Sequence, residues 1–85
     1  MAAELLALIR TEGIVELADN FGVADDLFLA GLDSLAVMQL LVAVEERCGV
    51  AFGAGDVTRE NFGTALALAR LVERKRKPTA SSGEP

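Results

Sequence analysis

The chain has 85 residues and a formal net charge of −5, and it contains no tryptophan, tyrosine or histidine. At this length we expect one domain with a modest core and no deeply enclosed active site. Hydrophobic residues make up 52% and the mean hydropathy is +0.38, so the chain is predicted to be globular rather than disordered. With few aromatic residues, the core must use Leu, Val, Ile and Ala, a composition that favours helices.

Charge is distributed unevenly along the chain. Residues 1–58 carry ten acids and two bases, whereas residues 59–85 carry three acids and six bases. Because an acidic surface repels phosphate backbones, nucleic-acid binding is excluded as an interpretation. The basic run at 74–77 is interpreted as cations that complement the C-terminus of a helix, not as a nucleic-acid or membrane patch.

Cysteine content and hydropathy indicate the compartment. The single cysteine, Cys48, rules out an internal disulfide and is expected to act as a small core residue. The N-terminus lacks the pattern of a signal peptide, and no apolar run approaches the ~18 residues of a membrane span. We therefore predict a soluble cytoplasmic protein without a membrane span.

The N-terminal part predicts one helix and one long loop. Apolar residues at roughly helical spacing predict a helix over about 3–19, which Gly13 is expected to kink or end early. Residues 20–33 predict a long ordered loop that packs its own apolar side chains, Phe21, Leu27, Phe28 and Leu32. Asp25 and Asp26 lack the spacing of a calcium loop and are interpreted as solvated or capping acids.

The clearest predicted helix runs from Ser34 to Cys48 and ends at Gly49. One stripe of this helix is predicted to face the core: Val37, Leu40, Leu41, Val44 and Cys48. A second apolar stripe consists of Leu35, Met38 and Val42. Because so short a chain cannot surround a helix, we expect the second stripe to be exposed near Ser34.

The C-terminal part predicts a loop, a short helix and a longer one. After a loop over 50–56, residues 58–62 predict one helical turn capped by Asp56 or Thr58. Thr64 is the predicted N-cap of a last helix that continues to about Lys77 and buries Ala65, Leu68, Ala69 and Val72. Pro78 stops this helix, so we divide the chain into a domain over 1–77 and a disordered tail over 78–85.

Catalytic groups are missing from the sequence. Ser34 follows Asp33, but a serine nucleophile needs an adjacent base, and the chain has no histidine. Neither a metal-ligand spacing nor a phosphate-binding glycine loop is present. We therefore predict that the protein is not an enzyme and holds no metal.

The segment Gly31-Leu32-Asp33-Ser34-Leu35 closely resembles the attachment motif of acyl and peptidyl carrier proteins. The resemblance continues through the helix to Gly49-Val50, resumes at Phe62-Gly63-Thr64, and covers about residues 3–77. It implies a four-helix bundle with a short third helix and a long loop between helices one and two. It also implies a 4'-phosphopantetheine arm, transferred from coenzyme A to Ser34, with Asp33 and Leu35 beside the attachment point.

The resemblance implies partners as well. They are a phosphopantetheinyl transferase, an adenylating or acyl-loading enzyme, and a downstream acyltransferase or synthase, which a monomeric carrier would visit in turn. We expect partner recognition from Leu35, Met38, Gln39, Val42, Glu45 and Glu46. Fatty-acid carriers usually have acidic residues where this chain has Ala36 and Gln39, which favours an apolar contact.

The segment 56–64 looks similar to D-alanyl carriers and stand-alone aminoacyl carriers, so an aminoacyl cargo is the preferred interpretation. Because the chain begins at Met1 and ends in a predicted disordered tail, we expect a free-standing carrier. A polyketide or fatty-acid carrier is the second interpretation. A helical interaction domain, with Ser34 as an ordinary N-cap hydroxyl, is the third.

Overall fold

The computed structural model describes residues 1–76, which form four α-helices and one 3₁₀ turn. The elements are α1 (Ala2–Thr11), α2 (Ser34–Cys48), η1 (Ala54–Asp56), α3 (Arg59–Phe62) and α4 (Ala65–Arg76). The prediction of an all-α fold with a short third helix is confirmed, and the predicted tail lies outside the described residues. No helix among the described residues is long and apolar enough to cross a membrane.

The first helix ends earlier than the predicted range. α1 stops at Thr11, because Gly13 adopts a φ of 66° and turns the chain out of the helix. This left-handed conformation is accessible to glycine at little cost. The N–H of Ile14 then donates to the carbonyl of Ile9 at 3.1 Å, and Val15 is buried from the loop instead of from a helix.

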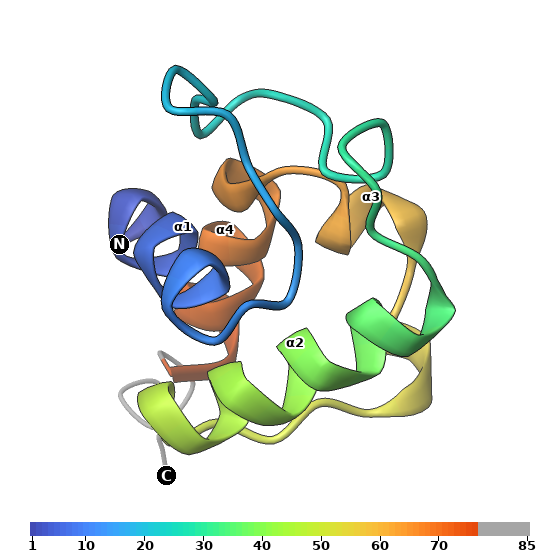
Figure 1. The fold of residues 1–85 in the computed structure, drawn as a ribbon. Helices are drawn as coiled ribbons and strands as arrows, with labels where there is room; N and C mark the ends of the chain where they lie inside the picture. The colour runs from blue at the N-terminus through green and yellow to red at the C-terminus, as the bar shows by residue number, and fades with distance from the viewer. Residues whose placement is uncertain (77–85) are drawn as a thin grey trace, which may run out of the picture.

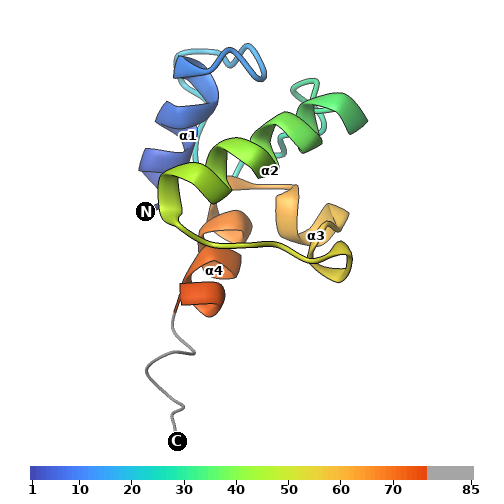
Figure 2. The ribbon, with the colours of Figure 1, turned by 90° about the horizontal axis from the view of Figure 1, so that it is seen from below.

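The helices pack around one apolar core. Figure 1 and Figure 2 show α1 beside α4, α2 running across the bundle, and α3 next to the start of α4. The long loop between α1 and α2 closes one side and contributes its own buried residues, Leu27 and Leu32. The largest fully buried side chains come from every helix and from this loop: Leu5, Ile9, Leu27, Leu40, Val44, Phe62, Leu68, Leu71 and Val72.

The core stripe of α2 is narrower than predicted. Val37, Leu40 and Val44 are buried as predicted, whereas Leu41 and Cys48 are only partly buried against the core. Successive residues of an α-helix are about 100° apart, so Leu41 lies at the edge of the stripe that Leu40 centres.

The C-terminal end of α4 is tied to η1 by an ion pair. Lys75 Nζ lies 2.5 Å from Asp56 Oδ2, and this carboxylate also accepts the Gly53 N–H at 2.8 Å. The hydrogen bond from Lys75, and next the one from Gly53, lowers the pKa of Asp56 below its usual value. Lys75 of the basic run thus stabilises a loop.

Replacing Leu40 by alanine should lower the free energy of unfolding by about 2–5 kcal/mol, because Leu40 is fully buried and would leave a cavity. The matched change Val42→Ala, on the exposed face of the same helix, should cost no more than about 0.5 kcal/mol. Urea denaturation of the two variants measures the difference. Equal losses in both would show that the face of α2 has been assigned wrongly.

The Asp56 carboxylate should make stability depend on pH. Because its pKa is lower in the folded state than in the unfolded chain, at ~3.9, its contribution is present above that pH. It is lost as the pH falls through the folded-state pKa. Wild type should therefore exceed Asp56→Asn in stability near neutral pH and lose that advantage in acid, and Lys75→Gln should weaken the dependence. A pH-independent difference would contradict this role.

Candidate functional site

Ser34 is exposed and is the first residue of α2. Asp33 caps this helix: its Oδ1 accepts the Ala36 N–H at 2.9 Å, and its carbonyl accepts the Val37 N–H at 2.8 Å. The first N–H groups of a helix have no intrahelical acceptor and form the positive end of its dipole. An anionic group attached to Ser34 therefore lies where the backbone stabilises negative charge.

Two acids shape the loop that leads to Ser34. Asp25 Oδ2 accepts the Gly22 N–H at 2.7 Å, and Asp26 Oδ1 accepts the N–H groups of Phe28 at 2.8 Å and Leu29 at 3.2 Å. These are turn caps formed by side chains of the loop itself. The two acids were interpreted as solvated or helix-capping, and they instead bond N–H groups within the loop.

Apolar anchors fix the same loop to the core. Leu27 is fully buried, and its N–H donates to the carbonyl of Gly63 at 2.7 Å, which ties the loop to the end of α3. Leu32 is buried two residues before Ser34. Between them Gly31 has a φ of 119°, a conformation that lets the chain turn sharply into α2.

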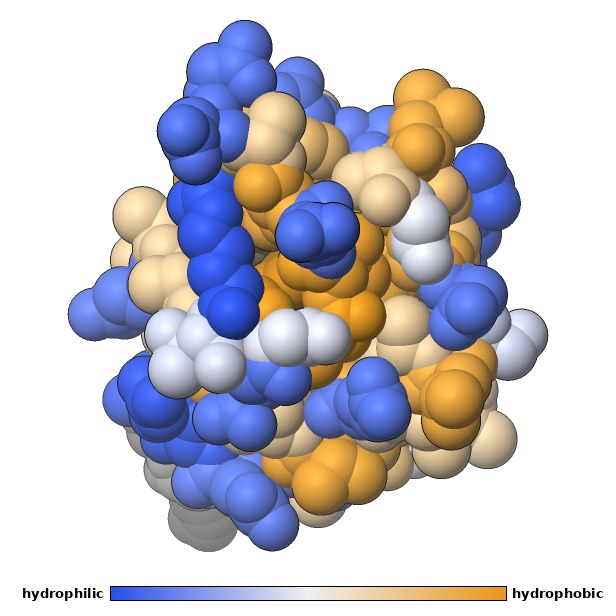
Figure 3. Space-filling view, viewed as in Figure 1, coloured by the Kyte–Doolittle hydropathy of each residue, from blue (hydrophilic) through white to orange (hydrophobic). Residues whose placement is uncertain are grey.

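Large exposed apolar side chains occur on both sides of Ser34 in the sequence, and we call them the exposed apolar face: Leu29 on the loop and Leu35, Met38 and Val42 on α2. The three residues on α2 were predicted to be exposed, and they are. Leu29 was missed, although it is 85% exposed, because a loop has no periodicity that separates it from its buried neighbour Leu27. Figure 3 shows apolar surface over the start of α2 and over the preceding loop, interrupted by polar side chains.

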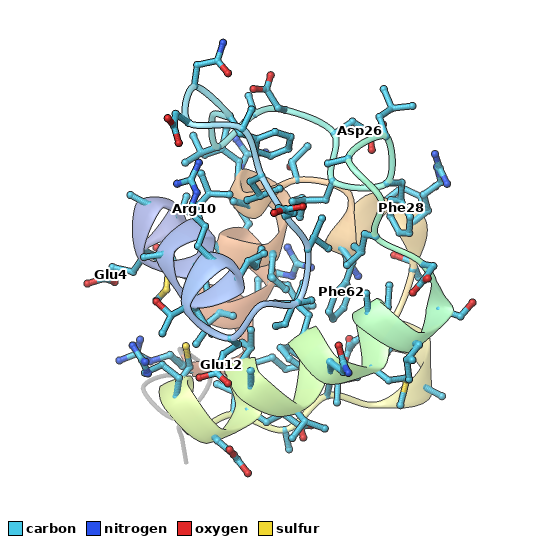
Figure 4. The ribbon with its side chains drawn as sticks, viewed as in Figure 1. Glu4, Arg10, Glu12, Asp26, Phe28 and Phe62 are labelled. Atoms are coloured by element: carbon cyan, nitrogen blue, oxygen red, sulfur yellow. The ribbon has the colours of Figure 1, made fainter. Side chains whose placement is uncertain are left out.

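An open cavity of about 350 Å³ lies beside Ser34. It is lined by Phe28, Ser34, Val37, Met38, Val57, Thr58 and Arg59. The guanidinium of Arg59 lies over the ring of Phe28, 4.5 Å from its centroid. Figure 4 shows Phe28 at the edge of the molecule, whereas Phe62 of α3 lies inside it. Sequence reasoning did not identify Arg59 or Val57 as neighbours of Ser34.

The remaining predicted recognition residues differ in their surroundings. Gln39 and Glu46 are exposed, whereas Glu45 Oε2 accepts the Phe52 N–H at 2.8 Å and helps to hold the chain after α2. Ala36 is buried in the first turn. Of the two positions at which fatty-acid carriers usually have acids, only that of Gln39 is exposed in this chain.

The site can hold a covalently attached anion, but it offers no means to activate Ser34. Histidine is absent from the sequence, and the Asp33 carboxylate is engaged with the Ala36 N–H. Across residues 1–76, no group of three or more metal-ligating side chains is found.

Comparisons with known proteins agree on one family. A family model described as a phosphopantetheine attachment site matches residues 3–72, whereas no curated protein matches the chain significantly. The chain is similar to a chain of a solved complex. That complex is the crystal structure of an engineered Bradyrhizobium japonicum glycine:[carrier protein] ligase complexed with carrier protein from Agrobacterium tumefaciens and ATP. That match has 26% identity and a TM-score of 0.75, and covers 86% of this chain and 96% of the other. The corresponding AMP complex gives 27% identity and a TM-score of 0.74, and covers 86% and 99% of the two chains.

The conformation of Gly31 gives a test of the site geometry. Gly31→Ala should lower stability by about 1–3 kcal/mol, because an L-residue is strained at this φ although space for its Cβ exists. Gly55→Ala adds a Cβ that meets nothing within 4 Å, at a residue without such a φ, and should be nearly neutral. Thermal denaturation compares them, and a Gly31→Ala variant as stable as Gly55→Ala would contradict the described turn.

Proposed function

The chain belongs to the family of phosphopantetheine attachment domains, and on that premise we propose that Ser34 carries the arm and that the cargo is an aminoacyl group. As a carrier protein of this family it has covalently attached 4'-phosphopantetheine as its cofactor. The terminal thiol of that arm forms a thioester with the cargo. The observation that carries the assignment of Ser34 is its position as an exposed first residue of α2, directly after the N-cap Asp33.

The surroundings of Ser34 fit an attached phosphodiester. A transferase joins the phosphopantetheinyl group of coenzyme A to Ser34 Oγ, and the adenosine bisphosphate portion leaves as the hydroxyl proton is removed. The product bears one negative charge next to the N–H groups of the first turn. Loop anchors on both sides of Gly31 hold the hydroxyl at the surface, where a transferase can reach it. The chain itself binds and positions, and the partner enzymes catalyse.

An aminoacyl cargo is supported by two observations. Both similar structures contain a glycine:[carrier protein] ligase with ATP or AMP, ligands that fit activation of an amino acid by adenylation. In addition, the exposed positions of the first turns of α2 lack the acids that fatty-acid carriers use. A polyketide or fatty-acid cargo is the second candidate. A panel of adenylating and acyl-loading enzymes, read out as thioester mass, distinguishes the two.

The exposed apolar face is the proposed docking surface for the loading enzyme. Leu35 is adjacent to the attachment point, and Met38 and Val42 follow on the same side of α2, so an enzyme approaching the arm must pass over them. Leu29 extends this face onto a loop that Asp26 holds in place. Exposed apolar patches on a protein surface mark sites of interaction with other proteins.

Ser34→Ala should abolish phosphopantetheine addition. Wild-type protein incubated with coenzyme A and a promiscuous transferase should gain the mass of one arm, whereas Ser34→Ala should gain none because the acceptor oxygen is missing. Thr11→Ala removes an exposed hydroxyl at the end of α1 and should be modified like wild type. Intact mass spectrometry gives the answer, and modification of Ser34→Ala would move the attachment point elsewhere.

Val42→Asp should slow loading by the cognate adenylating enzyme about tenfold, because burying an unpaired carboxylate under a partner costs ~1–3 kcal/mol. Ala7→Asp, which adds the same charge at an exposed site on α1, should load normally. An apolar contact should also keep most of its rate when ionic strength rises. A steep salt dependence together with normal loading of Val42→Asp would show that acids such as Glu46 carry recognition.

A further inference from the structure

The cavity beside Ser34 combines an apolar lining with one base. Phe28, Val37, Met38 and Val57 supply apolar surface, and Arg59 is the basic residue among those that line it. Its volume of about 350 Å³ is at the lower end of the ~300–1,000 Å³ range of small-molecule pockets. The cavity is therefore suited to a small group that is apolar over most of its length and anionic at one end.

A phosphodiester on Ser34 would lie close to acidic residues, and a nearby base can offset the resulting repulsion. Asp33 is the residue before Ser34, and Asp26 lies in the preceding loop, so a phosphodiester on Ser34 adds negative charge to an acidic segment. The helix dipole offsets part of this repulsion. A guanidinium at the edge of the same cavity can offset more, because it pairs with phosphate oxygens through two parallel hydrogen bonds.

Arg59 is held by a contact that it can exchange. Its guanidinium lies over the ring of Phe28, and a cation–π contact at an exposed site is a weak interaction. Charge-assisted hydrogen bonds from a guanidinium to a phosphate are bidentate and stronger than neutral ones. An anion on Ser34 therefore competes with the Phe28 ring for the Arg59 guanidinium. When the guanidinium moves to the anion, the ring remains as part of the apolar lining of the cavity.

We infer that Arg59 pairs with the phosphodiester on Ser34 and thereby positions the root of the arm in this cavity. The inference rests on the proposed attachment at Ser34. In phosphopantetheine the carbon after the ester methylene bears two methyl groups, which match the apolar lining that Phe28 and Val57 supply. The rest of the arm, with its terminal thiol, would then stay accessible to the partner enzymes.

NMR of the protein with the attached arm tests the pairing of Arg59 with the phosphodiester directly. Intact mass first establishes that the arm is attached, and the geminal methyl protons of the arm are then examined for nuclear Overhauser contacts to Phe28 and Val57. Wild type should show these contacts, and its Arg59 Nε–H resonance should shift when the arm is attached. Arg59→Gln should lose the contacts, Arg59→Lys should keep only part of them, and Arg70→Gln should retain them, because Arg70 is exposed on α4 and does not line the cavity.

The outcomes separate the two proposals. No mass gain would overturn the proposed attachment and this inference with it. A mass gain without methyl contacts in wild type, or with equal contacts in Arg59→Gln, would overturn the inference alone. Matching spectra of unloaded wild type and Arg59→Gln exclude misfolding as the cause of a loss. In wild type the contacts should also weaken near 1 M salt, where charges are screened beyond ~3 Å.

Discussion

Burial of a single stripe of α2 is the constraint on which the rest of the structure depends. Val37, Leu40 and Val44 fix the rotation of α2 against the bundle, and they share one apolar core with buried residues of α1, α4 and the long loop. Once this stripe is inside, the other apolar stripe of the helix must lie outside, because the domain is too small to cover both. The position of Ser34 follows from the same packing, since the helix that starts at Ser34 is held over its first three turns.

The loop before α2 extends this control to the end of the helix. The carboxylates of Asp25 and Asp26 accept backbone N–H groups that define its turns, and the buried side chains of Leu27 and Leu32 anchor it on either side of Gly31. Such a loop costs little rearrangement when a partner binds, because its conformation is already fixed. Exposure of Leu29 on this loop is therefore a stable property of the surface.

Sequence patterns predicted the helices well where periodicity and capping agreed. For α2, the apolar spacing, Ser34 and Gly49 gave both bounds, and for α4 the cap Thr64 gave the start. The end of α1 was less certain, because Val15 and Leu17 continue a helical spacing that the backbone leaves at Gly13. Whether Gly13 kinks or ends a helix depends on packing against α4 and the loop, which local sequence does not contain.

The same distinction holds for the site. Ser34 and Asp33 were assigned to the site because residues 31–35 resemble an attachment motif, whereas the exposed face of α2 was predicted from the regular repeat of that helix. The cavity was not, since it forms where residues distant in sequence, Phe28 and Arg59, meet. Leu41 lies at the edge of the buried stripe of α2. Helical spacing alone does not decide whether such a residue is buried, because its burial depends on the side chains that pack beside it.

The central claim is that attachment of the arm to Ser34 leaves the core unchanged and alters only the surface around Ser34. Amide hydrogen exchange of the protein with and without the attached arm tests this claim most directly. The account predicts unchanged protection at core positions of α2 and α4 such as Leu40 and Val72, with differences confined to residues 28–38 and 57–60. Altered protection throughout α1 and α4 on loading would contradict it.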